Sequence, residues 1–213
     1  MKILGIETSC DETAVSVVDG SGVLEAPEFK VLSSVVSSQM KLHAEWGGVV
    51  PMLAKREHQK NLVPVLEQCL RESSLFKERS APLPPTTYNL QPLLIREPNL
   101  IAPLTKLLQT IEAPDIAAIG VTKGPGLEPA LWVGINFAQA LANAWQKPLY
   151  AINHMEGHIL AALLGGKEEG GSSESQASRS LASNSDPEAR LPKGPNLVIG
   201  QSEMKCENGR VKV

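Results

Sequence analysis

The chain has 213 residues, 42% of them hydrophobic, and a formal net charge of −3, so a real core is expected and a globally basic nucleic-acid-binding surface is excluded. No run of about 18 apolar residues occurs, which argues against a membrane span. The three cysteines are widely spaced and predict neither a disulfide framework nor a cysteine metal site, so we expect a cytoplasmic protein.

The first 38 residues predict three strands, at 2–8, 14–18 and 31–38, with a turn at 19–22. The loop between the first two strands contains Ser9, Asp11 and Glu12. Hydroxyl, carboxylate and loop N–H groups in such a place can hold a phosphate and order Mg²⁺. A hairpin turn that is merely polar is the alternative.

Residues 52–71 predict a helix, with Pro51 suited to its first turn. The notable basic cluster of the chain lies on and before this helix and consists of Lys41, Lys55, Arg56, His58 and Lys60. Lys55, Arg56 and His58 are the candidates for contact with RNA phosphates. The alternative is an ordinary solvated helix face.

Residues 76–103 contain six prolines and predict a surface insertion, followed by a short helix at 104–111. A strand at 115–122 then runs into a turn that contains Gly124 and Gly126, and residues 130–145 predict a long helix. A glycine-rich turn before a helix N-terminus can bind an anion. The spacing is neither that of a Walker A loop nor G-x-G-x-x-G.

A short strand at 147–152 leads into His154 and His158, which lie on one face if their segment is helical. Two imidazoles at this spacing can bind one metal ion. The order is His-x-Glu-x-His rather than His-Glu-x-x-His, which argues against a zinc peptidase. Two polar histidines at a helix start are the alternative to a metal site.

The last 48 residues differ in composition from the rest. Residues 166–195 are rich in Gly, Ser, Glu and Asn, which predicts a low-complexity linker. Residues 196–213 predict a β-hairpin with arms at 196–200 and 210–213 and a turn at 207–209.

Four segments in order resemble the TsaD/Kae/OSGEP family, the tRNA threonylcarbamoyladenosine transferases once grouped as M22 glycoproteases. They are residues 5–13 (GIETSCDET), 43–58 (HAEWGGVVPMLAKREH), 122–127 (TKGPGL) and 153–158 (NHMEGH). The second segment is similar to the bacterial and organellar branch. The resemblance covers most of residues 1–165 outside the insertion.

This resemblance implies an α/β fold of the actin/Hsp70/sugar-kinase (ASKHA) type, with residues 1–165 as the N-terminal lobe, a mixed sheet flanked by helices. It implies transfer of threonylcarbamoyl from threonylcarbamoyl-AMP to the adenosine 3′ of the anticodon in tRNAs that read ANN codons. His154 and His158 would be ligands of one Fe(II) or Zn(II) ion per subunit, with Mg²⁺ accompanying the nucleotide. Asp11 and Glu12 would order phosphate and Mg²⁺ or act as general base.

The resemblance also implies partners: tRNA, contacted by Lys55, Arg56 and His58, a TsaB-like paralogue and a TsaE-like ATPase. Ser9, Gly124 and Gly126 remain the candidates for phosphate binding. The family's Ser-Gly-Gly-His-Thr segment does not occur at 197–203, and the expected second lobe, with a third metal ligand, is missing. A catalytically inactive half-protein that acts as an interaction module is therefore the alternative to an enzyme.

Overall fold

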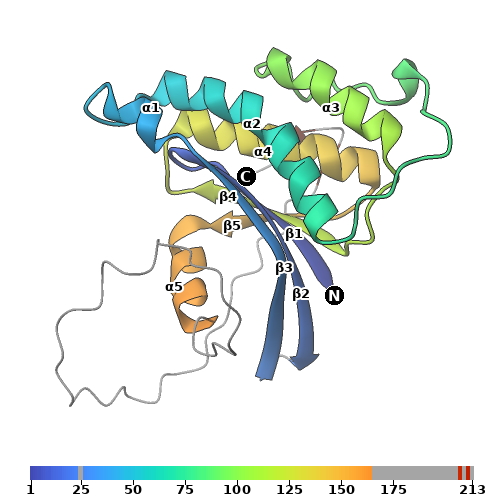
Figure 1. The fold of residues 1–213 in the computed structure, drawn as a ribbon, viewed down its shortest axis with the longest axis horizontal. Helices are drawn as coiled ribbons and strands as arrows, with labels where there is room; N and C mark the ends of the chain where they lie inside the picture. The colour runs from blue at the N-terminus through green and yellow to red at the C-terminus, as the bar shows by residue number, and fades with distance from the viewer. Residues whose placement is uncertain (24–25, 165–205, 208–209, 212–213) are drawn as a thin grey trace.

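A five-stranded mixed sheet forms the centre of the molecule in the computed structural model, which describes residues 1–23, 26–164, 206–207 and 210–211 (Figure 1). The order of the strands is β3-β2-β1-β4-β5. β1 pairs antiparallel with β2 and parallel with β4, and β4 pairs parallel with β5. The strands are β1 (Lys2–Glu7), β2 (Glu12–Val23), β3 (Ala26–Ser38), β4 (Ala118–Gly124) and β5 (Leu149–Asn153).

Helices cover the sheet unequally. α1, α2, α3 and α4 lie on one side of it, and α5 lies on the other side beside β5 (Figure 1). This mixed sheet with flanking helices is the fold class that the sequence predicted. None of the helices in the described ranges is both long enough and apolar enough to span a bilayer. The helices are α1 (Met40–Ala44), α2 (Pro51–Glu72), the 3₁₀ turn η1 (Pro85–Thr87), α3 (Pro98–Thr110), α4 (Glu128–Trp145) and α5 (His154–Leu164).

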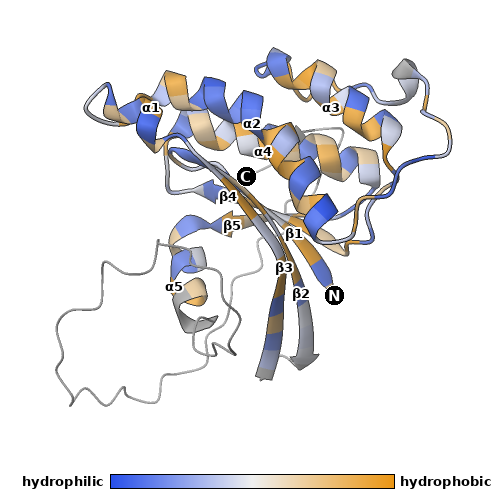
Figure 2. Cartoon of the chain, viewed as in Figure 1, coloured by the Kyte–Doolittle hydropathy of each residue, from blue (hydrophilic) through white to orange (hydrophobic). Residues whose placement is uncertain are grey.

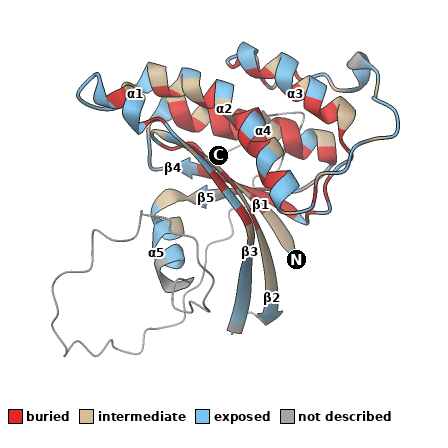
Figure 3. Ribbon diagram, in the orientation of Figure 1, coloured by how far each residue is buried: buried red, intermediate tan, exposed pale blue. Residues whose placement is uncertain are grey.

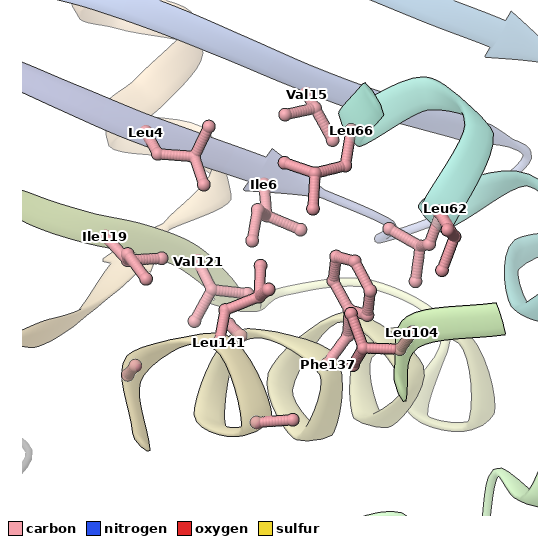
Figure 4. Packing of buried hydrophobic residues seen from close by; sticks show 14 of the residues in the cluster. Leu4, Ile6, Val15, Leu62, Leu66, Leu104, Ile119, Val121, Phe137 and Leu141 are labelled. Carbon is pink, nitrogen blue, oxygen red and sulfur yellow. The ribbon is translucent and has the colours of Figure 1, made fainter. Parts of the chain in front are cut away.

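The hydrophobic core lies between the sheet and the helices α2 and α4 (Figures 2 and 3). Successive side chains of β1 point to opposite faces of the sheet. Leu4 and Ile6 are therefore buried under the helices, while Ile3, Gly5 and Glu7 occupy the opposite face. Figure 4 shows Leu4 and Ile6 among leucine, valine and phenylalanine side chains from α2, α4 and the neighbouring strands. Each fully buried side chain of this size stabilises the fold by about 1.5–3 kcal/mol.

The turn predicted at residues 19–22 is wrong. β2 continues through these residues to Val23, and Asp19, Gly20 and Gly22 pair with Lys30, Phe29 and Pro27 of β3. The polar and glycine residues that suggested a turn lie in a long antiparallel ribbon, where tertiary pairing outweighs their local preference.

The insertion predicted at residues 76–103 does lie at the surface, since most of its side chains are exposed, but a few leucines attach it to the core. Leu90, Leu94 and Leu100 are at most 3% exposed and join the core. α3 begins at Pro98, six residues before the predicted start, because a proline fits the first helical turn and Pro103 is accommodated inside the helix. The prolines set the path of this segment, while Leu90, Leu94 and Leu100 are buried.

The end of the chain is described only at β6 (Cys206–Glu207) and β7 (Arg210–Val211), which pair antiparallel. The second of these strands falls within the predicted arm at 210–213. The other predicted arm, 196–200, and the predicted linker, 166–195, lie outside the described residues.

Candidate metal and nucleotide site

The candidate site lies at one edge of the sheet, where the parallel strands β1, β4 and β5 end. Glu7 closes β1, Thr122 stands near the end of β4, and Asn153 closes β5. The carboxyl ends of parallel strands meet at the same edge, which is the usual place for a ligand in α/β proteins. Three segments far apart in the sequence thus come together here.

His154 and His158 both lie on α5, directly after β5. The side chain of Asn153 accepts hydrogen bonds from the N–H groups of Met155 (2.9 Å) and Glu156 (3.3 Å), and so caps the start of this helix. The i and i+4 spacing then brings the two imidazoles together, with 3.0 Å between their Nε2 atoms and perpendicular rings. The segment is helical, so the expectation that both histidines lie on one face is confirmed, and their Nε2 atoms lie within hydrogen-bonding distance of each other.

Glu7 lies behind His154. Its Oε2 accepts hydrogen bonds from Thr122 Oγ1 at 2.6 Å and from His154 Nδ1 at 3.1 Å, and its Oε1 accepts one from the Ser9 N–H. Burial raises the pKa of Glu7, but the hydrogen bonds from Thr122, Ser9 and His154 outweigh burial, and the net pKa lies below its ordinary value. An ionised Glu7 therefore accepts a hydrogen bond from the Nδ1–H of His154, so His154 Nε2 carries a lone pair, which here accepts from His158 Nε2.

This donor set fits the metal ion that the family resemblance implies. Neutral imidazole nitrogens are ligands of both Zn²⁺ and Fe²⁺, and a carboxylate on the far ring nitrogen is a common support for such a ligand. No group of three or more His, Cys, Asp or Glu side chains suited to a metal occurs in the part of the chain that the structure describes. The two histidines would supply an incomplete, open site.

Two loops adjoin this pair, one after β1 and one after β4. Ser9 Oγ lies 3.3 Å from His154 Nδ1, and the backbone carbonyl of Ser9 accepts the Leu127 N–H at 2.7 Å. A Cβ on Gly126 would stand 2.6 Å from that carbonyl oxygen, so only glycine allows this close approach. Gly124 has φ +143°, a conformation that also favours glycine. The predicted phosphate-binding residues Ser9, Gly124 and Gly126 thus lie on adjacent loops.

The start of α4 suits an anion less well than its sequence suggested. Pro129 has no N–H, and the N–H groups of Ala130 and Leu131 both donate to the carbonyl of Leu127. Glu128 adds a negative charge in the first turn. Because free N–H groups and a positive helix end attract anions, this helix start is a weak anion site.

Asp11 and Glu12 follow Ser9 at the outer part of the same loop. Glu12 is exposed and Asp11 is half-buried, while the Asp11 carbonyl accepts the Gln39 N–H at 2.8 Å. The backbone of the loop is therefore fixed, and the two carboxylates remain accessible to a ligand.

The basic cluster divides in the structure. His58 is 0% exposed, so the prediction that it contacts tRNA is wrong. Its ring bonds Thr13 and the carbonyl of Cys10 because it lies on the buried face of α2. Lys55 points toward the buried Glu97, with 3.6 Å between the charged atoms, whereas Arg56 is exposed.

A shallow hollow of about 280 Å³ adjoins the site on the open face of the sheet. Glu7 and Thr122 stand at one end of it. Three isoleucines, Ile3, Ile6 and Ile152, also line it, and the remaining lining residues are small: Gly5, Ala14, Ser16, Ser34 and Gly120.

The sequence analysis did not single out Glu7, Thr122 or Asn153 as site residues. The signal for Glu7 was a carboxylate that closes an apolar strand, on the face opposite Leu4 and Ile6. Its partners Thr122 and His154 are 115 and 147 residues away, so the pairing itself could not be predicted locally.

A family model described as TsaD, tRNA N6-adenosine threonylcarbamoyltransferase, matches residues 30–79 and 98–172, which is more than half of the chain. The interval between these ranges falls in the insertion. Two curated relatives are named tRNA N6-adenosine threonylcarbamoyltransferase. That of Persephonella marina is 41% identical over 164 residues, covering 77% of this chain and 35% of the relative. That of Anaeromyxobacter sp. (strain Fw109-5) is 38% identical over 165 residues, covering 77% and 36%.

Solved structures give weaker likenesses. YeaZ from Pseudomonas aeruginosa matches at 17% identity and a TM-score of 0.34, over 71% of this chain and 43% of that protein. RuvC from Thermus thermophilus matches at 13% identity and a TM-score of 0.37, over 79% of this chain and 74% of that protein. The chain spans about a third of the length of the curated relatives it matches. By the family model, it belongs to the tRNA N6-adenosine threonylcarbamoyltransferase (TsaD) family.

Proposed function

We propose that this chain carries the metal- and substrate-binding lobe of a tRNA N6-adenosine threonylcarbamoyltransferase and acts in the cytoplasm. The observation that carries the proposal is the convergence of the His154 and His158 Nε2 atoms, 3.0 Å apart, with Glu7 bonded to the far nitrogen of His154. The segment that holds both histidines falls within the range matched by the family model.

His154 and His158 would hold one Fe(II) or Zn(II) ion, with further ligands from outside this pair. When bound, the metal would polarise the carbamoyl carbonyl of threonylcarbamoyl-AMP as a Lewis acid. The Ser9 hydroxyl would donate a hydrogen bond to the adenylate phosphate. Asp11 or Glu12 would order the Mg²⁺ that accompanies the nucleotide.

In the proposed reaction, the exocyclic amine of the tRNA adenosine forms a C–N bond with the carbamoyl carbon. The C–O bond to the phosphate breaks, and AMP leaves with the electron pair. The amine must lose one proton. Whichever of Asp11 and Glu12 does not order the Mg²⁺ accepts this proton as general base. Arg56 is exposed on α2 and would contact a tRNA phosphate.

The test measures metal content and threonylcarbamoyl-AMP binding of the 213-residue chain beside a His154→Ala/His158→Ala variant. Stoichiometric Zn or Fe and adenylate binding, both lost in the variant, are the expected results. Single-turnover transfer to an ANN-reading tRNA is then measured with and without a TsaB-like paralogue and a TsaE-like ATPase. A chain that binds neither metal nor adenylate would contradict the proposal.

The alternative, an interaction module in the same modification complex, is favoured by one observation. Met40, Trp46 and Met52, around the α1–α2 connection, are each more than 60% exposed. Such a group of apolar side chains suits a protein partner. A Trp46→Ser change would weaken binding of a TsaB-like paralogue by at least tenfold in a titration, while leaving metal content unchanged. Unchanged affinity in the variant would contradict this alternative.

A further inference from the structure

Buried polar side chains form a continuous hydrogen-bonded chain from the start of α2 to the loop that carries Asp11 and Glu12. The Val50 N–H lies 3.4 Å from His43 Nδ1, and His43 Nε2 lies 3.1 Å from Gln39 Oε1. Gln39 Nε2 then lies 3.3 Å from His58 Nδ1. The chain ends where His58 Nε2 lies 3.1 Å from the Cys10 carbonyl oxygen.

The chemistry of the two ends fixes the direction of every bond. A backbone N–H only donates, so His43 Nδ1 accepts, and its proton sits on Nε2 and is donated to Gln39. The amide nitrogen of Gln39 also only donates, so His58 Nδ1 accepts. The proton of His58 is therefore on Nε2, which faces a carbonyl oxygen that only accepts. Both imidazoles are held in one neutral tautomer.

Thr13 reinforces this arrangement. Its Oγ1 lies 2.7 Å from His58 Nδ1, which makes it the shortest contact of the network. Thr13, Gln39, His43 and His58 are each at most 4% exposed, so water does not compete for these bonds. Burial lowers the pKa of His58, which agrees with a neutral ring.

The network donates hydrogen bonds to two successive backbone carbonyl groups of the loop. His58 binds the Cys10 carbonyl, and the Gln39 N–H donates to the Asp11 carbonyl at 2.8 Å. These contacts stand next to the accessible carboxylates of Asp11 and Glu12, on the side of the loop that faces the core. A side chain needed only to fill space there could be apolar, as Leu62 and Leu66 are on the same helix.

We propose that His58 is a positioning residue, kept in its Nε2–H tautomer by Thr13 and Gln39, which holds residues 10–12 so that the carboxylates of Asp11 and Glu12 stay fixed beside the substrate. This inference rests on the proposed function, because the proposed function assigns Asp11 and Glu12 their roles at the substrate. His58 itself is buried and contacts neither tRNA nor adenylate.

The experiment compares the 213-residue chain with four variants: Thr13→Val, Thr110→Val, His58→Gln and His58→Leu. Thr13→Val removes the donor to Nδ1 at nearly constant shape, and Thr110→Val is its matched control on α3, where the hydroxyl bonds only local helix carbonyls. His58→Gln keeps a donor near the Nε2 position. Readouts are the ¹⁵N shifts of the histidine rings, amide exchange at residues 10–12, and the single-turnover transfer rate.

Thr13→Val should weaken the preference of His58 for the Nε2–H tautomer, raise amide exchange at residues 10–12 about tenfold, and slow transfer about ten- to hundredfold at unchanged metal content. Thr110→Val should change none of these. His58→Gln should retain more of the rate and loop protection than His58→Leu.

A folded Thr13→Val chain with unchanged loop exchange would overturn the inference, as would equal losses in His58→Gln and His58→Leu. If the parent chain transfers nothing, the proposed function fails, while the ring shifts and amide exchange still decide whether His58 positions the loop.

Discussion

Replacing Glu7 by glutamine tests whether this carboxylate prepares His154 to bind a metal ion. The substitution keeps the shape of the side chain and removes its charge. Glu7 accepts three hydrogen bonds, from Ser9, Thr122 and His154, whereas a glutamine side chain accepts at only one of its two ends. In either orientation, the new NH₂ group therefore faces a donor.

The two orientations have different consequences. If the NH₂ faces His154, the imidazole has to move its proton to Nε2, the atom that points toward His158 Nε2. If it faces Ser9, the loop loses the bond to the Ser9 N–H. Loss of such a carboxylate support typically weakens metal binding 10- to 100-fold, or about 1.4–2.7 kcal/mol.

The assay is competition for Zn²⁺ against a chromophoric chelator at neutral pH. Glu112→Gln, an exposed glutamate on the loop before β4, is the matched control and should bind as the parent chain does. The His154→Ala/His158→Ala variant sets the level of non-specific binding. Parent-like affinity in Glu7→Gln, with binding lost in the double variant, would refute the role assigned to Glu7.

Three further predictions concern stability and tRNA binding. Gly126→Ala should lower the free energy of unfolding by about 1–3 kcal/mol, because its Cβ would stand 2.6 Å from the Ser9 carbonyl. Gly157→Ala, whose Cβ meets nothing within 4 Å, should raise it by about 0.5–1 kcal/mol, so equal effects in denaturant titrations would contradict the packing argument. Lys55→Met should lower the free energy of unfolding by about 1–3 kcal/mol, because it leaves the buried Glu97 without its cation. Arg56→Met should leave the free energy of unfolding unchanged and weaken tRNA binding. The reverse pattern would refute these separate roles for the two residues. The pKa of His58 lies below its ordinary value, chiefly through burial, so the unfolded chain binds the extra proton first as the pH falls. The free energy of unfolding should therefore be independent of His58 protonation above about pH 6.5 and fall below that pH by up to about 1.4 kcal/mol per pH unit. In unfolding curves measured across pH, His58→Gln should reduce this slope.

Local sequence patterns were sufficient for most of the regular structure. The alternation of Leu4 and Ile6, the helical rhythm of α2 and the small-residue helix α4 are all properties of neighbouring residues, and each element formed close to its predicted place. The spacing of His154 and His158 likewise predicted a shared helix face, because the helical period alone decides it.

Local preference was overruled at one turn and was incomplete for one insertion, in both cases because of contacts with distant residues. The Asp19–Gly22 stretch has turn chemistry, yet β3 pairs with it and extends the strand. The prolines of residues 76–103 predicted a surface segment, and most of it is exposed, yet Leu90, Leu94 and Leu100 are buried in the core, which the composition did not indicate. Composition reports what a segment prefers alone, and it does not report which surface is available to cover it.

The sequence by itself determined the family, the order of the elements and the pair of histidines. Only the tertiary structure decided how their neighbours are used, because each deciding contact joins residues far apart in the chain. Glu7 became the support of His154 across 147 residues, and His58 turned inward to the Cys10 carbonyl across 48. Burial then fixed which of these polar groups are hydrogen-bonded inside the protein and which remain free to meet a ligand.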